Sequence, residues 1–249
     1  MSSSSKKNLK REELVYLSKL YEKAERYPDM INTINKFVEL NPKLTKDERN
    51  ILSSGYKNII SDKRASWRLL NSMEKKEKSK ESLQLENIKL VKNELEKDLT
   101  KIIDEVLSII DKYLIPNAED PENKVYYMKL KADYCRYKCE YAIGKEFNEA
   151  CSLAEKVYQE ASEIAEKSIP ISSSTRLGLA LNYSVFFYEI KGQKEEACKI
   201  SKNAFKEAMK VFDILEKAKP KDSILIIQLL KENLILWNNE MNDDDEEEK

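Results

Sequence analysis

The segment from Lys124 to Tyr141, KVYYMKLKADYCRYKCEY, constrains the fold more than any other stretch of this sequence. Most of its positions are apolar or aromatic, and they recur around the whole circumference of a helix rather than along one stripe. A helix that is apolar nearly all round has to be covered by other elements on most sides. The segment therefore predicts a helix packed inside a multi-helix protein.

The same segment carries charges where a covered helix should have few. Lys129, Asp133 and Arg136 stand at i, i+4 and i+7, so they stack along one stripe of the helix. Charges on a largely covered helix are costly unless a partner compensates them. Because one carboxylate cannot satisfy two cations, the stripe indicates a site that awaits an anion.

The rest of the chain is also typical of helices. Among 249 residues, 36% are charged and only four are Gly, which favours long helices with solvated outer faces. We expect an all-α protein of nine antiparallel helices, because no stretch shows useful strand alternation. The helices differ in length and share no common period, so a regular solenoid is not expected. Four of the expected helices span about 47–74, 82–114, 195–217 and 223–239.

The chain ends differ in composition from its body. Residues 1–9 are rich in Ser and Lys, and we expect them to be disordered. Residues 10–239 are expected to form a single helical domain. Residues 240–249 include an unbroken acidic run and are expected to be a disordered acidic tail.

Composition excludes several kinds of chemistry. The chain has no His, so Ser-His and Cys-His nucleophiles and His-ligated zinc are ruled out. It has no glycine-rich phosphate loop and no recognisable carboxylate dyad, so we expect neither an enzyme nor a cofactor or metal site. We expect Cys135, Cys139, Cys151 and Cys198 to be buried, reduced thiols.

Charge and hydropathy indicate where the protein works. The net charge is −1, and without the acidic tail the body has only a modest positive excess, too little for a nucleic-acid binder. The amino terminus has no apolar signal region, and no run approaches the roughly 18 apolar residues of a membrane span. We expect a cytoplasmic protein that binds neither nucleic acid nor membrane.

A second set of cations repeats the spacing of Lys129 and Arg136. Lys57, Arg64 and Arg68 stand at i, i+7 and i+11 on the third expected helix. Two helices with such pairs could converge on a tetrahedral dianion, with the Tyr137 hydroxyl as a further donor. Alternatively, these are ordinary exposed charges or internal pairs with nearby carboxylates.

Two further expected helices combine apolar faces with an amide. Asn182, Val185 and Glu189 form one line on the seventh helix, and Asn233 stands between Leu229 and Trp237 on the ninth. An amide in an apolar face matches the N–H and C=O of a peptide backbone, although an Asn satisfied within the fold fits equally well. Basic helices and apolar helices with Asn together suit an extended phosphopeptide.

Several ordered motifs make the sequence resemble the 14-3-3 family from about Glu12 to Trp237. Two of them resemble the family signatures, and four others stand between these in the right order. The motifs are Arg49–Ile59, Ser66–Arg68, Leu114–Ala118, Asp133–Tyr137, Arg176–Asn182 and Lys221–Trp237.

The resemblance implies a cup-shaped bundle of nine helices, usually a dimer, that binds phosphoserine or phosphothreonine segments of client proteins. It also implies a role for each matching position. The phosphate cluster is Lys57, Arg64, Arg136 and Tyr137; the ligand-backbone set is Asn182, Asn233 and Lys129; the groove wall is Leu181, Val185, Glu189, Leu225, Ile226, Leu229 and Trp237.

The resemblance also implies a homodimer, weakened or rearranged at one contact. The aligned interface positions are Leu20, Ala24, Arg26, Asp29, Ser66, Val91, Glu94 and Asp98. Asp98 can pair with Arg26, as the family pattern requires. Asp29, however, aligns with Glu94 where the family has a Lys, so a salt bridge would become a repulsion.

Two functions follow from these patterns. The first is a non-enzymatic adaptor that masks, clamps or bridges phosphorylated clients. The alternative is a scaffold similar to helical repeats, which would bind acidic or carboxylate-terminated peptides without needing phosphate.

Overall fold

The computed structural model describes residues 10–77, 83–211 and 221–247, with side chains as far as residue 242. Within these ranges it contains nine α-helices, one π-helical turn and no strand, which confirms the all-α expectation. The chain divides into two compact units, Met1–Asn117 and Ala118–Lys249, here called the N-terminal and C-terminal units.

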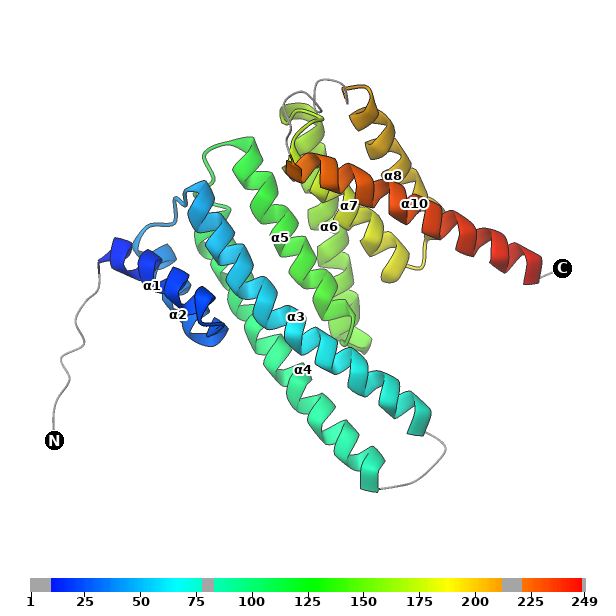
Figure 1. The fold of residues 1–249 in the computed structure, drawn as a ribbon, viewed down its shortest axis with the longest axis horizontal. Coiled ribbons are helices and arrows are strands. Elements are labelled where there is room, and N and C mark those ends of the chain that lie inside the picture. Colours follow the sequence, from blue (N-terminus) through cyan, green and yellow to red (C-terminus); the bar gives the residue numbers. More distant parts are fainter. Residues whose placement is uncertain (1–9, 78–82, 212–220, 248–249) are drawn as a thin grey trace. The chain divides into compact units, whose positions relative to one another are not determined.

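The N-terminal unit is built from helical hairpins. Figure 1 shows the two long helices α3 and α4 side by side, with α1 and α2 packed near the start of α3. Thr45 and Glu48 form a capping box at the start of α3: the Thr45 N–H donates to Glu48 Oε2 (2.8 Å) and the Glu48 N–H to Thr45 Oγ1 (3.3 Å). The elements are α1 (Arg11–Lys23), α2 (Tyr27–Leu40), α3 (Lys46–Glu77), α4 (Leu83–Ile109) and η1 (Ile110–Leu114).

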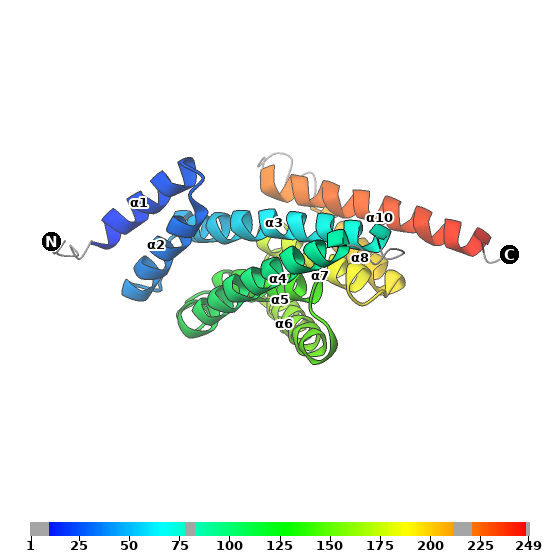
Figure 2. The same ribbon diagram turned by 90° about the horizontal axis from the view of Figure 1, so that it is seen from below.

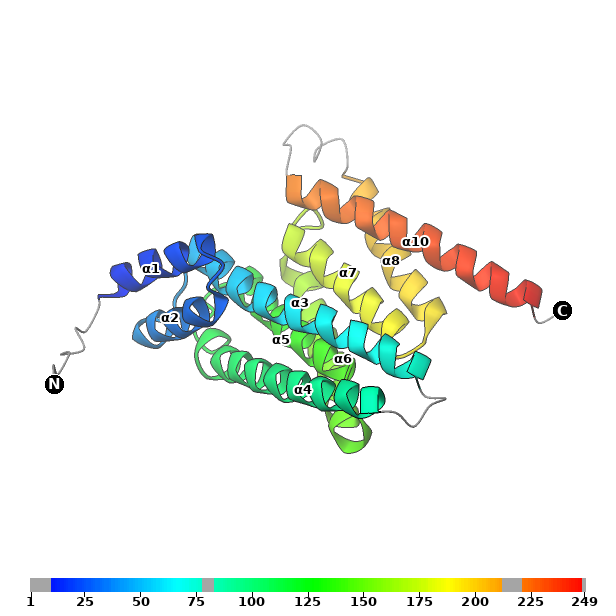
Figure 3. The same ribbon diagram turned by 60° about the horizontal axis from the view of Figure 1, so that its bottom comes forward.

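The C-terminal unit contains the helix that dominates the sequence. In it α5 packs on α6 and α7, and α10 lies against α7 and α8, as Figures 2 and 3 show from two sides. Asp120 caps α5 by accepting from the Asn123 N–H (2.8 Å), and Pro121 takes the first helical position. The elements are α5 (Pro121–Cys139), α6 (Gly144–Ser168), α7 (Ser174–Glu189), α8 (Lys194–Met209) and α10 (Lys221–Glu247).

Some helix ends differ from the sequence expectation. The fourth helix finishes in the π-helical turn η1, where the Ile115 N–H donates to the Ile110 carbonyl at 2.9 Å. The helix α8 ends at Met209, and the end predicted at residue 217 lies outside the described residues. The helix α10 continues through Glu247, past the predicted end at 239. The N-terminal segment 1–9 also lies outside the described residues.

Candidate functional site

The helix α5 buries charge together with its apolar side chains. Ten of its residues are buried, and among them Asp133 and Arg136 are only 4% and 6% exposed. Lys129 lies one turn before Asp133 and is half-buried. The covered helix and its charged stripe are therefore as the sequence predicts.

Asp133 is held by three different side chains. Its Oδ2 accepts from Lys129 Nζ at 2.8 Å, and its Oδ1 accepts from the Tyr158 hydroxyl at 2.5 Å. The Asn182 side-chain amide nitrogen lies 2.9 Å from both carboxylate oxygens. Since these partners come from α5, α6 and α7, Asp133 ties the three helices together around one buried carboxylate.

The electrostatics keep this cluster ionised. Burial acts to raise the pKa of Asp133, but the charges of Lys129 and Arg136 outweigh it and leave that pKa below its usual value. Burial likewise acts to lower the pKa of Lys129, and Asp133 outweighs it, so the Lys129 pKa is raised. The carboxylate and its cations therefore all keep their charge at neutral pH.

Arg136 is fixed on one side and faces a weak partner on the other. Its Nε donates to the Tyr158 hydroxyl at 3.4 Å, and its guanidinium carbon lies 4.7 Å from the centre of the Tyr137 ring. Its NH1 is 3.6 Å from Glu189 Oε2, in a side chain that is 46% exposed. A long ion pair to an exposed carboxylate is weak, so an incoming anion can replace Glu189.

Apolar residues of α7 and α10 lie beside this cluster. A Cβ on Gly178 would lie 3.5 Å from Lys129 Cε and 3.7 Å from Ile226 Cδ1, which are ordinary packing distances, so both side chains lie beside α7 at this position. Leu181 and Ile226 pack on the core formed by Leu177, Ala208, Ile227 and Leu230. Val185 is half-buried, whereas Leu225 and Leu229 are 56% and 37% exposed.

Trp237 and Asn233 occupy different environments on α10. Trp237 is 4% exposed, and its ring stacks on Tyr188 with centroids 4.6 Å apart. Asn233 lies one turn earlier and is half-buried. Trp237 therefore packs against Tyr188 of α7 and presents little of its own surface.

The other predicted phosphate ligands lie in the N-terminal unit. On α3, Lys57 is exposed and Arg64 is half-buried. They belong to a different unit from Arg136 and Tyr137, so the convergence of the four stays a prediction.

The predicted interface residues lie on α1 to α4 and are mostly exposed. Leu20 and Val91 are 43% and 46% exposed, and Ala24, Ser66 and Glu94 are exposed as well. Arg26 Nε donates to Asp29 of the same chain at 2.7 Å. Lys63 Nζ lies 2.6 Å from Asp98, also in the same chain.

The sequence interpretation missed Tyr158, which is completely buried and touches both Asp133 and Arg136. It lies within the apolar stripe of α6, where a tyrosine is not distinctive. The sequence holds one signal that could have pointed to Tyr158. Ala154 and Ala161 stand at i−4 and i+3 from it, and these small side chains, fully buried in the structure, leave room for a large ring.

The thiols are all free, as expected. Cys135, Cys139 and Cys151 are buried as predicted, whereas Cys198, also predicted to be buried, is only half-buried. Burial raises the pKa of Cys139 to about 12, so this thiol stays protonated at neutral pH. Within the described ranges, no group of three potential ligands is placed to hold a metal ion. None of the described helices is both long and apolar enough to cross a membrane.

Comparison with known proteins identifies relatives across nearly the whole chain. The family profile described as "14-3-3 protein" matches residues 17–238. The chain is 44% identical over 240 residues to 14-3-3-like protein C of Glycine max, covering 96% of this chain and 93% of that protein. It is 44% identical over 241 residues to Protein BMH2 of Saccharomyces cerevisiae, covering 96% and 88%. It is 45% identical over 236 residues to 14-3-3-like protein GF14 omicron of Arabidopsis thaliana, covering 94% of each.

Proposed function

The chain belongs to the 14-3-3 family, and we propose that it is a non-enzymatic adaptor that binds client segments carrying phosphoserine or phosphothreonine. The observation that carries this function most directly is the buried Arg136, whose Nε donates to the Tyr158 hydroxyl that is itself held by Asp133. Tyr158 and the Tyr137 ring hold the guanidinium, Asp133 holds the Tyr158 hydroxyl, and the exposed Glu189 lies at a long 3.6 Å from the Arg136 NH1. An arginine fixed in this way is prepared for a phosphate, whose oxygens accept paired N–H donors.

The phosphate is shared among residues of both units. Arg136 and the Tyr137 hydroxyl supply donors from α5, and Lys57 and Arg64 supply cations from α3. A phosphoserine carries nearly two negative charges at neutral pH and three strong acceptor oxygens, so it needs several cations, whereas a carboxylate needs fewer. Replacement of Glu189 by the phosphate removes the long ion pair to Arg136 and frees this carboxylate to move towards solvent.

The peptide backbone binds next to the phosphate. Asn182 directs its amide nitrogen at Asp133, which leaves its side-chain oxygen to accept a backbone N–H of the ligand. Asn233 on α10 holds the next part of the backbone, and Lys129 contributes charge nearby. The side chains of the ligand pack on Leu181, Val185, Leu225, Ile226 and Leu229, with Glu189 and Trp237 at the flank.

The protein acts by occupancy and catalyses no reaction. It covers or clamps the phosphorylated segment, and residues 10–239 work as one domain in the cytoplasm. A homodimer through α1 to α4 places two such sites in one particle, so a client with two phosphorylated segments gains avidity. The alternative scaffold that needs no phosphate is not favoured by the family membership.

Fluorescence polarisation tests this function with a phosphoserine peptide and its unphosphorylated twin. We expect binding of the phosphopeptide alone. Lys57→Glu, on an exposed residue of α3, should weaken that binding by at least tenfold, because it replaces a cation at the phosphate with an anion.

The matched control is Lys75→Glu, an exposed residue on the same face of α3 about five turns further on. It makes the same charge change away from the site and should leave affinity nearly unchanged. Equal binding of the two peptides, or equal losses in the two variants, would contradict the function.

A further inference from the structure

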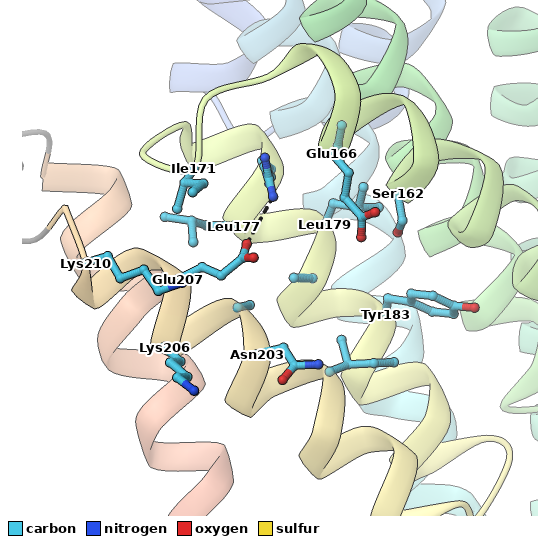
Figure 4. A pocket seen from close by; sticks show the side chains of 15 residues that line it. Ser162, Glu166, Ile171, Leu177, Leu179, Tyr183, Asn203, Lys206, Glu207 and Lys210 are labelled. Atoms are coloured by element: carbon cyan, nitrogen blue, oxygen red, sulfur yellow. Dashed lines mark hydrogen bonds and ion pairs between the residues drawn. The ribbon is translucent and has the colours of Figure 1, made fainter.

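A cavity of about 440 Å³ lies in the C-terminal unit, between α6, the segment that follows it, α7 and α8 (Figure 4). Its volume is within the range of about 300–1,000 Å³ that is typical of small-molecule sites. Its α7 residues include Leu179, Ala180 and Tyr183, whereas the phosphopeptide site uses Asn182 and Val185. The two sites therefore use different faces of α7.

The floor of this cavity is apolar and rigid. Leu177 and Leu179 are each 2% exposed, and Ala165 is 1% exposed, so these side chains are anchored in the core. Ala180 and Ile200 extend the apolar lining on α7 and α8. Such a floor favours an apolar ring or chain, because each buried CH₂ contributes about 0.8 kcal/mol.

Arg176 keeps one end of the cavity in place. Its NH1 donates to the Ile169 carbonyl at 2.9 Å, and its NH2 donates to Glu207 Oε2 at 3.0 Å. These bonds connect the end of α6, the start of α7 and the last turn of α8. The cavity walls are therefore tied together without a ligand, so a ligand meets a preformed site.

The remaining charges lie on opposite sides of the opening. Lys206 lies on α8, Lys210 directly follows that helix, and Glu166 lies on α6; Figure 4 labels all three. All three are exposed, and none forms an ion pair within the part of the chain that the structure describes. Since Glu207 is neutralised by Arg176, the lining has an excess of one positive charge.

We propose that this cavity binds a small amphiphilic carboxylate, with its apolar ring or chain on the Leu177–Leu179 floor and its single negative charge between Lys206 and Lys210. A ligand with one negative charge neutralises the single excess positive charge of the residues that line the cavity. A dianion would meet the carboxylates of Glu166 and Glu207, and a cation would meet two lysines. This site does not depend on phosphopeptide binding, so either function can fail without the other.

The test compares three ligands of nearly equal shape on the full chain by isothermal titration calorimetry. They are naphthylacetate, its neutral amide naphthylacetamide, and the cation naphthylmethylamine. We expect naphthylacetate to bind roughly tenfold more tightly than the amide, the size of one charge-assisted contact, and the amine to bind most weakly. Amide chemical shifts in NMR should change at Leu179, Tyr183 and Asn203, which line the cavity.

Variants separate this cavity from the rest of the surface. The double variant that carries both Lys206→Glu and Lys210→Glu should bind naphthylacetate no more tightly than its amide. Lys202→Glu is the matched control, because Lys202 is exposed on α8 but does not line the cavity. Ala180→Phe should fill the cavity and weaken all three ligands while phosphopeptide binding is retained.

Equal affinity for naphthylacetate and its amide in the wild-type chain would overturn the proposal. So would an unchanged preference in the Lys206 and Lys210 variant, or shift changes confined to other helices. The lysine variants alter exposed side chains, so they test the proposal even if Ala180→Phe does not fold.

Discussion

One hydroxyl, that of Tyr158, contacts both Asp133 and Arg136, the two buried charged residues on which the proposed phosphate site rests. Tyr158→Phe removes the donor to Asp133 and the acceptor for Arg136 Nε, and leaves the ring in place. Hydrogen bonds to charged groups contribute about 1.5–3 kcal/mol, so we expect the free energy of unfolding to fall by that amount. We also expect phosphopeptide affinity to fall several-fold, because Arg136 loses a fixed orientation.

Chemical denaturation and fluorescence polarisation measure these two effects. The matched control is Tyr183→Phe, because the Tyr183 ring stacks on Tyr158 with centroids 5.1 Å apart but its hydroxyl does not contact Asp133 or Arg136. If both variants lose phosphopeptide affinity equally, Tyr158 acts by general packing and does not position Arg136.

The lowered pKa of Asp133 leads to a second prediction, which concerns how the free energy of unfolding depends on pH. Because its folded-state pKa lies below the ordinary value of 3.8, its stabilising effect is complete above about pH 4. The effect is lost as pH falls through the folded-state pKa. Asp133→Asn leaves Lys129 without its ion-pair partner and removes a nearby negative charge from Arg136, so at neutral pH we expect a loss of about 3–5 kcal/mol.

Urea denaturation at a series of pH values between about 2.5 and 7 measures this difference. The range brackets the pKa of an ordinary carboxyl group, which is about 4. The gap in unfolding free energy between the wild type and Asp133→Asn should be constant above pH 4 and shrink below it. A gap that stays constant down to the lowest pH would show that ionisation of Asp133 does not stabilise the fold.

The charged stripe on α5 could be predicted from the sequence, but the residues of other helices that hold Asp133 could not. The spacing of Lys129, Asp133 and Arg136 is a property of one helix, so helical periodicity is sufficient to predict it. The contacts of Asp133 with Tyr158 and Asn182 join helices that are far apart in sequence. Periodicity says which face of a helix is covered, but it does not say which residue of another helix covers it.

At the scale of a helix, Gly55 in α3 balances helix propensity against packing. A Cβ at this position would lie 2.9 Å from Ile34 Cδ1 and 3.3 Å from Met30 Sδ, and both of these side chains are fully buried. Gly55→Ala gains up to about 1 kcal/mol of helix propensity, but overpacking costs about 1–3 kcal/mol. We expect a net loss near 1 kcal/mol in the free energy of unfolding.

Thermal and urea denaturation measure that change, and α-helix content by circular dichroism should stay the same. A variant more stable than the wild type would mean that Ile34 moves aside at little cost, so that the gain in helix propensity outweighs the cost of overpacking. The sequence already indicates that a glycine inside a long helix needs a packing reason, and the close contact with α2 supplies one.

Helix interiors could be predicted better than helix ends. Prolines and capping residues mark the starts, as Asp120 and Pro121 do for α5. The π-helical turn Ile110–Leu114 has no comparable mark, because its residues also suit an ordinary α-helix. The continuation of α10 to Glu247 was unexpected because an acidic run at a carboxyl-terminal helix end opposes the helix dipole.

At the scale of the whole molecule, each unit contributes part of the proposed phosphate site. Lys57 and Arg64 lie in the N-terminal unit, and Arg136 and Tyr137 lie in the C-terminal unit. Composition and periodicity predict each cationic helix by itself. Their combination in one site is a prediction from the family resemblance, because no local pattern relates residues so far apart in the chain.

The proposed homodimer leads to the last prediction, which concerns Glu94. Family resemblance places Glu94 opposite Asp29 of a second copy, and Asp29 already lies 2.6 Å from Arg26 NH2 of its own chain. Glu94→Lys removes a repulsion and adds a second cation near Asp29. Exposed ion pairs contribute about 0–1 kcal/mol each, and a two-fold dimer contains this contact twice, so we expect the dimer to tighten by up to about thirtyfold.

Sedimentation equilibrium at low and high salt measures the dimer dissociation constant. The gain should be larger at low salt, because salt screens exposed charges. Glu86→Lys is the matched control: it makes the same charge change at an exposed position of α4 outside the proposed interface. If both variants tighten the dimer equally, the change in net charge alone is responsible. If Glu94→Lys weakens the dimer, Glu94 faces a cation of the second copy and the subunits meet in another register.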